Sequence, residues 1–498
     1  MLNLGLAVLS AILLILLNPA PSITMLAPVA LAPLLIAAVR EKDGRRRLLL
    51  GQVAGIVYWS SVCYWILFVL EVHGAMTPPL SWLAFVLFAL AKGALFAVFT
   101  YLAGPVMRTP WAVPGVAALW TGIERMNGPL GFAWLTLGNA GADMGLPMRL
   151  APITGVYGLS FVFAMMSAAF AVVVLRRPRW QAAPVLVLPL LVALPPLPPP
   201  DAGTESAAVV QPDVSQSQEW TTEAQQALIR RLVTASLAAV FEQGQPPPAL
   251  LLWPENPAPL YFYHDRDFRE QAVRIARTTR THFLFGAVGF TTDNAPLNSA
   301  VLLAPSGEVM SRYDKMYLVP FGEFIPPLFS WVNRITKEAG DFEPGRQVVV
   351  SQVGPHRLGT FICYESAFPE LVRRFANEGG EVLVNLTNDG YFGRSAARRQ
   401  HLALARMRAA ENRRWVLRPT NDGYTVAIDP AGRPREALPA FEPATGRLKF
   451  SWIREKTFYT RHGDWFAWMC LAVGLGAFLA ALVPRYRPNG AKLQSTRP

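Results

Sequence analysis

The sequence predicts a membrane α-helical bundle of about eight transmembrane helices joined to one soluble α/β domain. Of its 498 residues, 52% are hydrophobic and only 16% are charged, whereas charged residues make up about 25% of an ordinary soluble protein. Long apolar runs lie towards both ends of the chain, and a stretch of ordinary composition separates the last two. This composition excludes a disordered chain, and three cysteines are too few for a disulfide scaffold.

Eight apolar runs are candidates for membrane helices. They lie near residues 4–17, 24–39, 48–70, 79–105, 111–124, 151–175, 180–196 and 463–484. Several of them have the ~20 residues that a helix needs to cross a bilayer. Asn18, Pro19 and Pro21 separate the first two runs, which are therefore either two short spans or one broken span. The first run lacks the basic start of a cleavable signal, so we expect it to remain as membrane structure.

The net charge of +12 is concentrated beside these apolar runs. Residues 1–200 carry 12 basic and 5 acidic residues and residues 463–498 carry 4 and 1, whereas residues 201–462 are nearly balanced, with 30 and 28. This distribution favours loops at a membrane surface over a groove for nucleic acid. With eight spans and the N-terminus inside, the clusters near Arg45, Arg108 and Arg177 and the basic tail all fall in the cytoplasm. The soluble segment is then expected on the outer face.

The pattern divides the chain into a bundle of about seven helices over 1–200, a soluble domain over 201–460, and a last span with a basic tail over 461–498. Within the soluble domain, β-rich runs bounded by Gly, Pro, Asn and Asp alternate with stretches of helical periodicity. The β-rich runs lie at 206–211, 248–253, 282–290, 297–304, 347–353, 357–363, 381–386 and 423–428, and the helical stretches at 220–242, 265–279, 367–378 and 395–412. This alternation predicts one domain with layers of sheet and helix.

Ionisable residues stand near the ends of β-rich runs in three segments of this domain. Glu255 follows a Leu-Leu-Trp-Pro run, Lys315 lies eight residues before Glu323, and Cys363 follows a Gly-Thr-Phe-Ile run. A thiol attacks only as thiolate, so it needs a base for its proton and a nearby cation. Glu255 and Lys315 are candidates for these two roles. Taken singly, each residue also fits an ordinary surface or core position.

The order and context of these residues resemble the Glu-Lys-Cys triad of the carbon–nitrogen hydrolase (nitrilase) superfamily. The whole chain, membrane spans included, resembles the bacterial apolipoprotein N-acyltransferase family. The matching blocks are Val319-Pro-Phe-Gly-Glu-Phe-Ile-Pro, Cys363-Tyr-Glu, Asn385-Leu-Thr-Asn-Asp-Gly-Tyr-Phe-Gly, Arg408-Ala-Ala-Glu-Asn and the segment from Gln211 to Trp220. Gly390 and Tyr391 stand where many members carry Ala and Trp.

The resemblance implies a four-layer αββα nitrilase-like sandwich and an enzyme of the bacterial inner membrane whose catalytic domain faces the periplasm. It implies transfer of an acyl chain from a membrane phospholipid, through a thioester on Cys363, to the N-terminal amine of diacylglyceryl-cysteine in an apolipoprotein. This reaction is the final step of lipoprotein maturation. Glu255 would act as the base, and Lys315 would stabilise the oxyanion.

The resemblance also indicates residues that support the triad. Glu323 matches the second carboxylate of the family and is expected to orient Lys315 or to assist near the thioester, or else to cap a turn. Tyr364 and Glu365 match residues that the family needs, and we expect them to shape the pocket and hold its wall.

Two further residues and one loop are candidates for contacts with substrate. Trp220 is either a gate or lipid platform, or a core tryptophan that begins an amphipathic helix. Asn388, together with Asp389, is expected to brace the loop near the thiol. The apolar loop 325–332 is expected to dip into the membrane.

No cofactor is implied, and the six histidines lie scattered without ligand spacing, so we expect no metal site. The expected partners are a phospholipid donor, a diacylglyceryl-modified apolipoprotein and membrane lipid, with no nucleic acid, and the expected state is a monomer. Two other functions remain open: a membrane-tethered carbon–nitrogen hydrolase that acts on small amides, and a non-enzymatic envelope protein.

Overall fold

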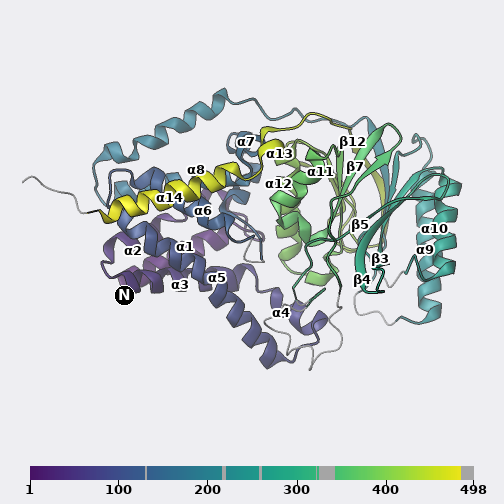
Figure 1. The fold of residues 1–498 in the computed structure, drawn as a ribbon, viewed down its shortest axis with the longest axis horizontal. Coiled ribbons are helices and arrows are strands. Elements are labelled where there is room, and N and C mark those ends of the chain that lie inside the picture. Colours follow the sequence, from purple (N-terminus) through teal and green to yellow (C-terminus); the bar gives the residue numbers. More distant parts are fainter. Residues whose placement is uncertain (129–131, 216–219, 257–260, 321, 325–341, 484–498) are drawn as a thin grey trace, which may run out of the picture.

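A computed structural model shows a helical part and a β-sandwich side by side (Figure 1). Both ends of the chain contribute to the helical part, and the residues between them form the sandwich. The structure describes residues 1–128, 132–215, 220–256, 261–320, 322–324 and 342–483.

The helical part contains apolar helices that are far apart in the sequence. They are α1 (Leu2–Leu16), α2 (Ala32–Arg40), α3 (Gly44–Val62), α4 (Ile66–Phe68), α5 (Pro78–Val106), α6 (Ala112–Arg125), α7 (Ala151–Thr154), α8 (Val156–Val174) and α14 (Trp465–Leu482), with a 3₁₀ helix over Arg179–Ala193. Glycines let α6 and α14 approach closely, since a Cβ on Gly122 would lie 2.5 Å from the Cα of Leu471. Small residues at such contacts are typical of helix pairs in membranes.

Each predicted apolar run contains a helix, but several of these helices are short. Among the described residues, α5, α8 and α14 are long and apolar enough to cross a membrane, and α3 with the segment 66–73 adds a fourth if their 64° bend lies within one span. The 15 residues of α1 and the 9 of α2 fall short of the ~20 that a straight span needs. The prediction of about eight spans is therefore not confirmed.

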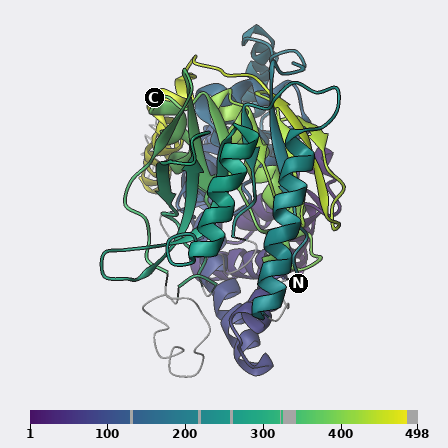
Figure 2. The ribbon, with the colours of Figure 1, turned by 90° about the vertical axis from the view of Figure 1, so that its right-hand side faces the viewer.

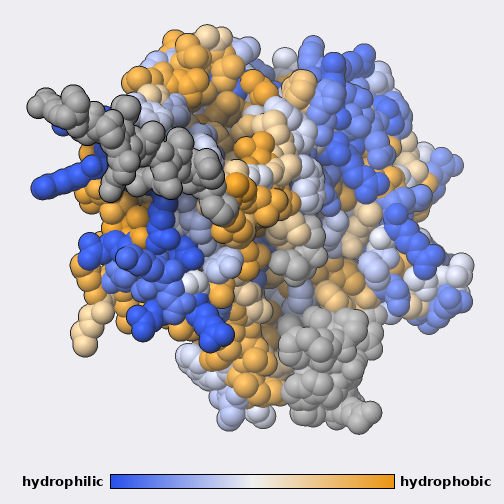
Figure 3. Space-filling view, turned by 60° about the vertical axis from the view of Figure 1, so that its left-hand side comes forward, coloured by the Kyte–Doolittle hydropathy of each residue, from blue (hydrophilic) through white to orange (hydrophobic). Residues whose placement is uncertain are grey.

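Apolar side chains cover much of the outside of the helical part. Figure 3 shows them gathered over this part, beside the more hydrophilic surface of the sandwich. Leu186, Leu190 and Leu479 are 77%, 65% and 62% exposed. An extended apolar surface of this kind is costly in water and is typical of contact with lipid, which agrees with the predicted membrane protein.

The sandwich consists of two six-stranded sheets. Their strand orders are β12-β1-β2-β3-β4-β5 and β11-β10-β9-β8-β7-β6. The first sheet contains β1 (Glu205–Gln211), β2 (Leu250–Leu252), β3 (His282–Phe290), β4 (Pro296–Leu303), β5 (Val309–Asp314) and β12 (Ala444–Phe450). The second contains β6 (Val350–Val353), β7 (His356–Ile362), β8 (Val382–Leu386), β9 (Val416–Arg418), β10 (Val426–Ile428) and β11 (Pro434–Ala437).

Helices connect the parallel strands and cover the outer faces of both sheets. In the first sheet, α9 (Thr222–Val240) and α10 (Arg266–Thr279) join β1, β2 and β3, and in the second, α11 (Pro369–Asn377) and α12 (Ala397–Asn412) join β7, β8 and β9. Parallel strands require such crossovers. Figure 1 shows α9 and α10 on the face of the first sheet that points away from the helical part, and in Figure 2 these teal helices lie in front of the sheet. Figure 1 also shows α11 and α12 between the second sheet and the helical part. The four layers confirm the predicted αββα sandwich.

Every predicted β-rich run contains a strand, whereas β5, β9, β11 and β12 were not predicted. β9 has only three residues, and all four residues of β11 are exposed. Neither strand therefore alternates between buried apolar and exposed polar residues, which is the pattern that predicts a strand from sequence.

Gln400 of α12 joins the sandwich to the helical part. Its side-chain oxygen accepts hydrogen bonds from the indole N–H groups of Trp134 at 2.8 Å and Trp65 at 3.3 Å. Its side-chain nitrogen donates to the carbonyls of Val62 at 3.1 Å and Pro19 at 3.2 Å. One buried side chain thus satisfies four polar groups from separate segments of the helical part.

Gln400→Met is expected to destabilise the packing of the two parts by a few kcal/mol. The change leaves four polar groups without their partner, and each unsatisfied buried group costs about 1–3 kcal/mol. Thermal unfolding in detergent should show a clear fall in Tm. The same change at the exposed Gln352, whose side-chain amide donates to the carbonyl of Gly354, should leave Tm unchanged. A Gln400→Met protein with the wild-type Tm would contradict this role.

Candidate active site

The predicted catalytic residues follow strands of both sheets. Glu255 follows β2 and Lys315 follows β5 in the first sheet, and Cys363 follows β7 in the second. All three are buried, with 6%, 1% and 4% of their surfaces exposed. Because the two sheets face each other, the sandwich brings residues from distant segments into one buried cluster.

Lys315 lies between two carboxylates. Its Nζ is 3.1 Å from Oε1 of Glu255 and 2.9 Å from Oε1 of Glu323. Burial alone would lower the pKa of Lys315, but the two carboxylates raise it well above its ordinary value. Lys315 is therefore a cation, and Glu323 lies in direct contact with it. Among the described residues, these two carboxylates accept hydrogen bonds from two of the three N–H groups of Lys315.

Both carboxylates are held by further donors. Nδ2 of Asn298 donates to Oε1 of Glu255 at 2.9 Å and to Oε1 of Glu323 at 2.5 Å. The backbone N–H of Asn388 donates to the second oxygen of Glu255 at 2.9 Å, and that of Val319 to the second oxygen of Glu323 at 2.8 Å. Asn388 thus braces the site through its backbone, and the orientation of both carboxylates is fixed.

Cys363 begins a short 3₁₀ turn with a φ of 49°. This left-handed conformation costs a non-glycine residue about 1–2 kcal/mol. Burial and the carboxylate of Glu255 raise the pKa of the Cys363 thiol well above its ordinary value, although Lys315 opposes them. The resting residue is therefore a neutral thiol, which needs a base at the moment of attack.

Glu365 ties the turn of Cys363 to the segment that carries Lys315. One of its oxygens accepts hydrogen bonds from the hydroxyl of Tyr313 and the N–H of Met316, and the other accepts from the N–H of Ile362, each at 2.7 Å. Burial raises its pKa to about 7, although these donors oppose the shift. Glu365 thus joins the turn of Cys363 to Tyr313 and Met316, and a role in holding the wall of the site stays a prediction.

Tyr364 lies where the turn of Cys363 meets the helical part. Its ring centroid is 6.1 Å from that of Phe132 and 6.2 Å from that of Trp134, and Phe368 packs on it edge-on at 5.1 Å. The residue after the nucleophile is therefore enclosed by aromatic side chains from both parts.

The structure does not place Trp220 beside the triad. The residue is half-buried and packs against the apolar core that α9 and α10 form on the first sheet. Its described contacts are those of a core tryptophan rather than of a gate or lipid platform. The predicted membrane-dipping loop 325–332 lies outside the described residues.

Two polar residues contact the site although their local sequences do not predict it. Asn298 lies within β4, beside Ser299 in an otherwise largely apolar strand. His401 lies on α12, and its Nε2 is 2.9 Å from the carbonyl oxygen of Cys363. In the sequence it is one of six scattered histidines, and nothing in its local pattern points to the site.

A cavity of about 830 Å³ lies between the helical part and the sandwich. Met316, Tyr317 and Leu318, which directly follow the triad lysine, line one side of it, and Arg125 lies on the other. Arg125 is paired with Asp464 at 2.5 Å and with Glu370. The size falls within the range of about 300–1,000 Å³ that is usual for ligand pockets.

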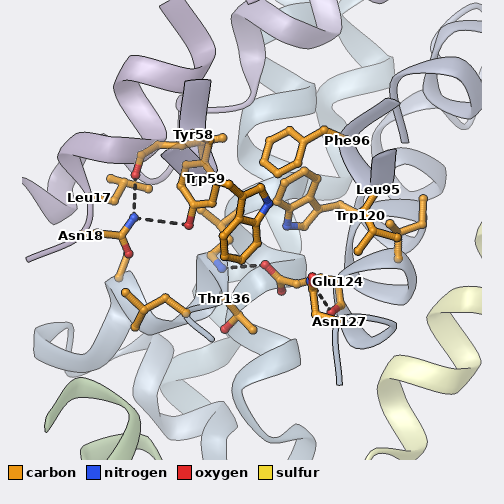
Figure 4. Close-up of a pocket in the computed structure, with 15 residues that line it drawn as sticks. Leu17, Asn18, Tyr58, Trp59, Leu95, Phe96, Trp120, Glu124, Asn127 and Thr136 are labelled. Carbon is orange, nitrogen blue, oxygen red and sulfur yellow. Dashed lines mark hydrogen bonds between the residues drawn. The ribbon is translucent and has the colours of Figure 1, made fainter. Parts of the chain in front are cut away.

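A smaller cavity lies inside the helical part (Figure 4). Its volume is about 40 Å³, which is room for a few water molecules. Nδ2 of Asn18 donates to the hydroxyl of Tyr58 at 3.4 Å, and Oε1 of Glu124 accepts from the N–H of Leu137 at 2.7 Å. No triad residue lines this cavity, which is therefore separate from the candidate active site.

Comparisons with known proteins cover almost the whole chain. The family model "Carbon-nitrogen hydrolase" matches residues 206–448, and the model "Apolipoprotein N-acyltransferase N-terminal domain" matches residues 10–169. The apolipoprotein N-acyltransferase of Geobacter metallireducens is 35% identical over 96% of this chain and 95% of its own length, and that of Nitrosomonas europaea is 31% identical over 93% and 92%. Among solved structures, an amidase from Nesterenkonia sp. is 22% identical, covers 53% of this chain and 94% of its own, and superposes with a TM-score of 0.38.

Proposed function

The chain belongs to the apolipoprotein N-acyltransferase family, and from this premise we propose that it acylates lipoproteins through a thioester on Cys363, with a membrane phospholipid as the acyl donor. It is an enzyme that N-acylates lipoproteins. The observation that carries the proposed mechanism is a buried lysine held between two carboxylates, whose charges all act on the buried thiol of Cys363. This arrangement supplies a base, a cation and a nucleophile in one place.

In the first half-reaction, Cys363 attacks the ester carbonyl of the phospholipid. The thiol proton moves to Glu255 as the sulfur–carbon bond forms, and Lys315 stabilises the negative charge that develops on the carbonyl oxygen. The carbon–oxygen bond to the glycerol then breaks. Glu255 returns its proton to that oxygen, which releases the lysophospholipid and leaves the thioester.

In the second half-reaction, the α-amine of diacylglyceryl-cysteine attacks the thioester. The amine attacks in its neutral form, after one proton has left the ammonium for solvent, and Glu255 accepts a second proton from the nitrogen as the carbon–nitrogen bond forms. The carbon–sulfur bond breaks, the amide remains, and Glu255 passes this second proton to the sulfur of Cys363. Glu323 keeps Lys315 between the two carboxylates during both steps, and Asn298 keeps both carboxylates in place.

The membrane arrangement belongs to the same proposal. We assign residues 1–200 and 461–498 to a bundle of about eight spans in the inner membrane and residues 201–460 to a catalytic domain on the periplasmic side, in a monomeric protein. The exposed apolar surface of the helical part supports contact with lipid. The large cavity between the two parts supports entry of a lipid substrate beside Lys315.

The test is acyl transfer by the purified full-length protein in mixed micelles. The substrates are a phospholipid with a labelled acyl chain and a synthetic diacylglyceryl lipopeptide with a free N-terminus. We expect the label in an amide at the peptide N-terminus, and none on the same lipopeptide with a blocked amine. Release of free fatty acid without labelled lipopeptide, or turnover of small soluble amides, would instead indicate a hydrolase.

A further inference from the structure

His401 of α12 contacts the backbone of the proposed nucleophile. Its Nε2 lies 2.9 Å from the carbonyl oxygen of Cys363, and the histidine is completely buried. A carbonyl oxygen only accepts hydrogen bonds, so Nε2 carries the proton and donates it. Another donor to this carbonyl, Nδ2 of Asn385, lies farther away at 3.5 Å.

A buried ion pair holds the opposite edge of the imidazole ring. Nδ1 of His401 lies 2.9 Å from Oδ1 of Asp389 and 3.0 Å from a guanidinium nitrogen of Arg418. The same nitrogen of Arg418 donates to both oxygens of Asp389, at 2.9 and 3.1 Å. Burial alone would raise the pKa of Asp389, but Arg418 and His401 hold it well below its usual range. The imidazole therefore has a fixed, charged support.

The left-handed backbone conformation of Cys363 makes its hydrogen bond with His401 relevant to the reaction. A non-glycine residue at a φ of 49° stays there only where its surroundings hold it. Because the peptide bond is planar, a fixed Cys363 carbonyl also fixes the following N–H and restrains the direction of the cysteine side chain. A displacement of about 1 Å at a reacting group can slow a reaction roughly 10²-fold.

We propose that His401 is a positioning residue, which holds the left-handed turn of Cys363 in the geometry for attack on the acyl donor. The inference rests on the proposed function only in taking Cys363 as the nucleophile. Its neighbour Gln400 binds the helical part through Trp134, Trp65 and two carbonyls. The position of His401 is therefore set by the helical part as well as by the sandwich.

Three substitutions of His401 distinguish a role in positioning Cys363 from a role in packing alone. His401→Phe keeps an aromatic ring against Trp134, which lies 6.0 Å away, but removes the donor. His401→Gln places an amide nitrogen as many bonds from Cβ as Nε2, and His401→Asn places it where Nδ1 stood. We expect thioester formation to be about 10–100-fold slower in the Phe and Asn variants, and within a few-fold of wild type in the Gln variant.

The measurement is the single-turnover rate of thioester formation on Cys363, expressed per folded molecule, with a phospholipid as the only substrate. His356→Phe is the matched control, because His356 also lies on a tryptophan ring, pairs with a carboxylate and belongs to β7. It is expected to lower Tm without changing this rate. Equal rates in the Gln and Asn variants, or a wild-type rate in His401→Phe, would overturn the inference. If wild-type protein formed no thioester on Cys363, the proposed function would fail instead.

Discussion

Replacing Glu255 by glutamine is expected to slow thioester formation by about 10²–10⁴-fold, while Cys363 becomes more reactive towards small alkylating reagents. The amide cannot accept the thiol proton, so the first half-reaction loses its base. The carboxylate of Glu255 also raises the pKa of the Cys363 thiol, whereas Lys315 lowers it. Without that carboxylate the pKa of the thiol falls, and more thiolate is present at neutral pH.

Two measurements on the same Glu255→Gln protein check this pair of opposite effects. Thioester formation is followed with phospholipid, and labelling of Cys363 by iodoacetamide is followed as a function of pH. The labelling midpoint should move to lower pH relative to wild type. Glu308→Gln, at an exposed glutamate, should change neither result. Acylation at the wild-type rate would exclude Glu255 as the base, and a loss of both reactivities would indicate that the change disrupts the site.

Replacing Lys315 by methionine is expected to reduce acyl transfer by about 10²–10³-fold, the usual cost of losing one oxyanion donor. The change also leaves the carboxylates of Glu255 and Glu323 facing each other without the cation that lies 3.1 and 2.9 Å from them. Breaking a buried ion pair by removing one partner typically costs about 3–5 kcal/mol. The protein should therefore lose stability as well as activity.

The loss of stability in Lys315→Met should depend on pH. Two carboxylates without a cation raise each other's pKa above the unfolded value. A carboxylate with a raised pKa destabilises the fold above its unfolded pKa, and the penalty disappears as pH falls and the proton binds. The deficit in Tm should thus be larger at pH 8 than at pH 5. Arg414→Met, which removes another buried cation that bonds to the carbonyl of Gly380, should lower Tm but leave acylation per folded molecule unchanged.

The triad could be predicted because its residues stand at the ends of strands in distinctive local sequences. Glu255 and Cys363 follow β2 and β7, and a side chain at the end of a buried strand can reach the edge where two sheets meet. Asn298 and His401 could not be predicted in this way. Each lies inside a regular element with no distinctive local sequence around it, and only the tertiary packing brings it to the carboxylates or to the Cys363 carbonyl.

The sandwich could be predicted more fully than the helical part. Strand runs and helical periodicity located its principal elements, because burial on one face leaves a pattern in the sequence. Hydropathy alone does not tell whether a run continues as one straight helix. The run 48–70 ends its first helix at Val62 and then bends by 64°, and the run 180–196, which contains Pro184 and Pro189, forms a 3₁₀ helix over Arg179–Ala193. Counting apolar runs therefore does not fix the number of spans.

The most direct test of the central claim is the search for an acyl group on the protein after incubation with phospholipid alone. Intact-mass and peptide mass spectrometry should find one acyl chain in thioester linkage on Cys363, stable until a lipopeptide amine is added. The adduct should be absent from Cys363→Ala. An acyl group on another residue, or lipopeptide acylation that persists in Cys363→Ala, would contradict the account.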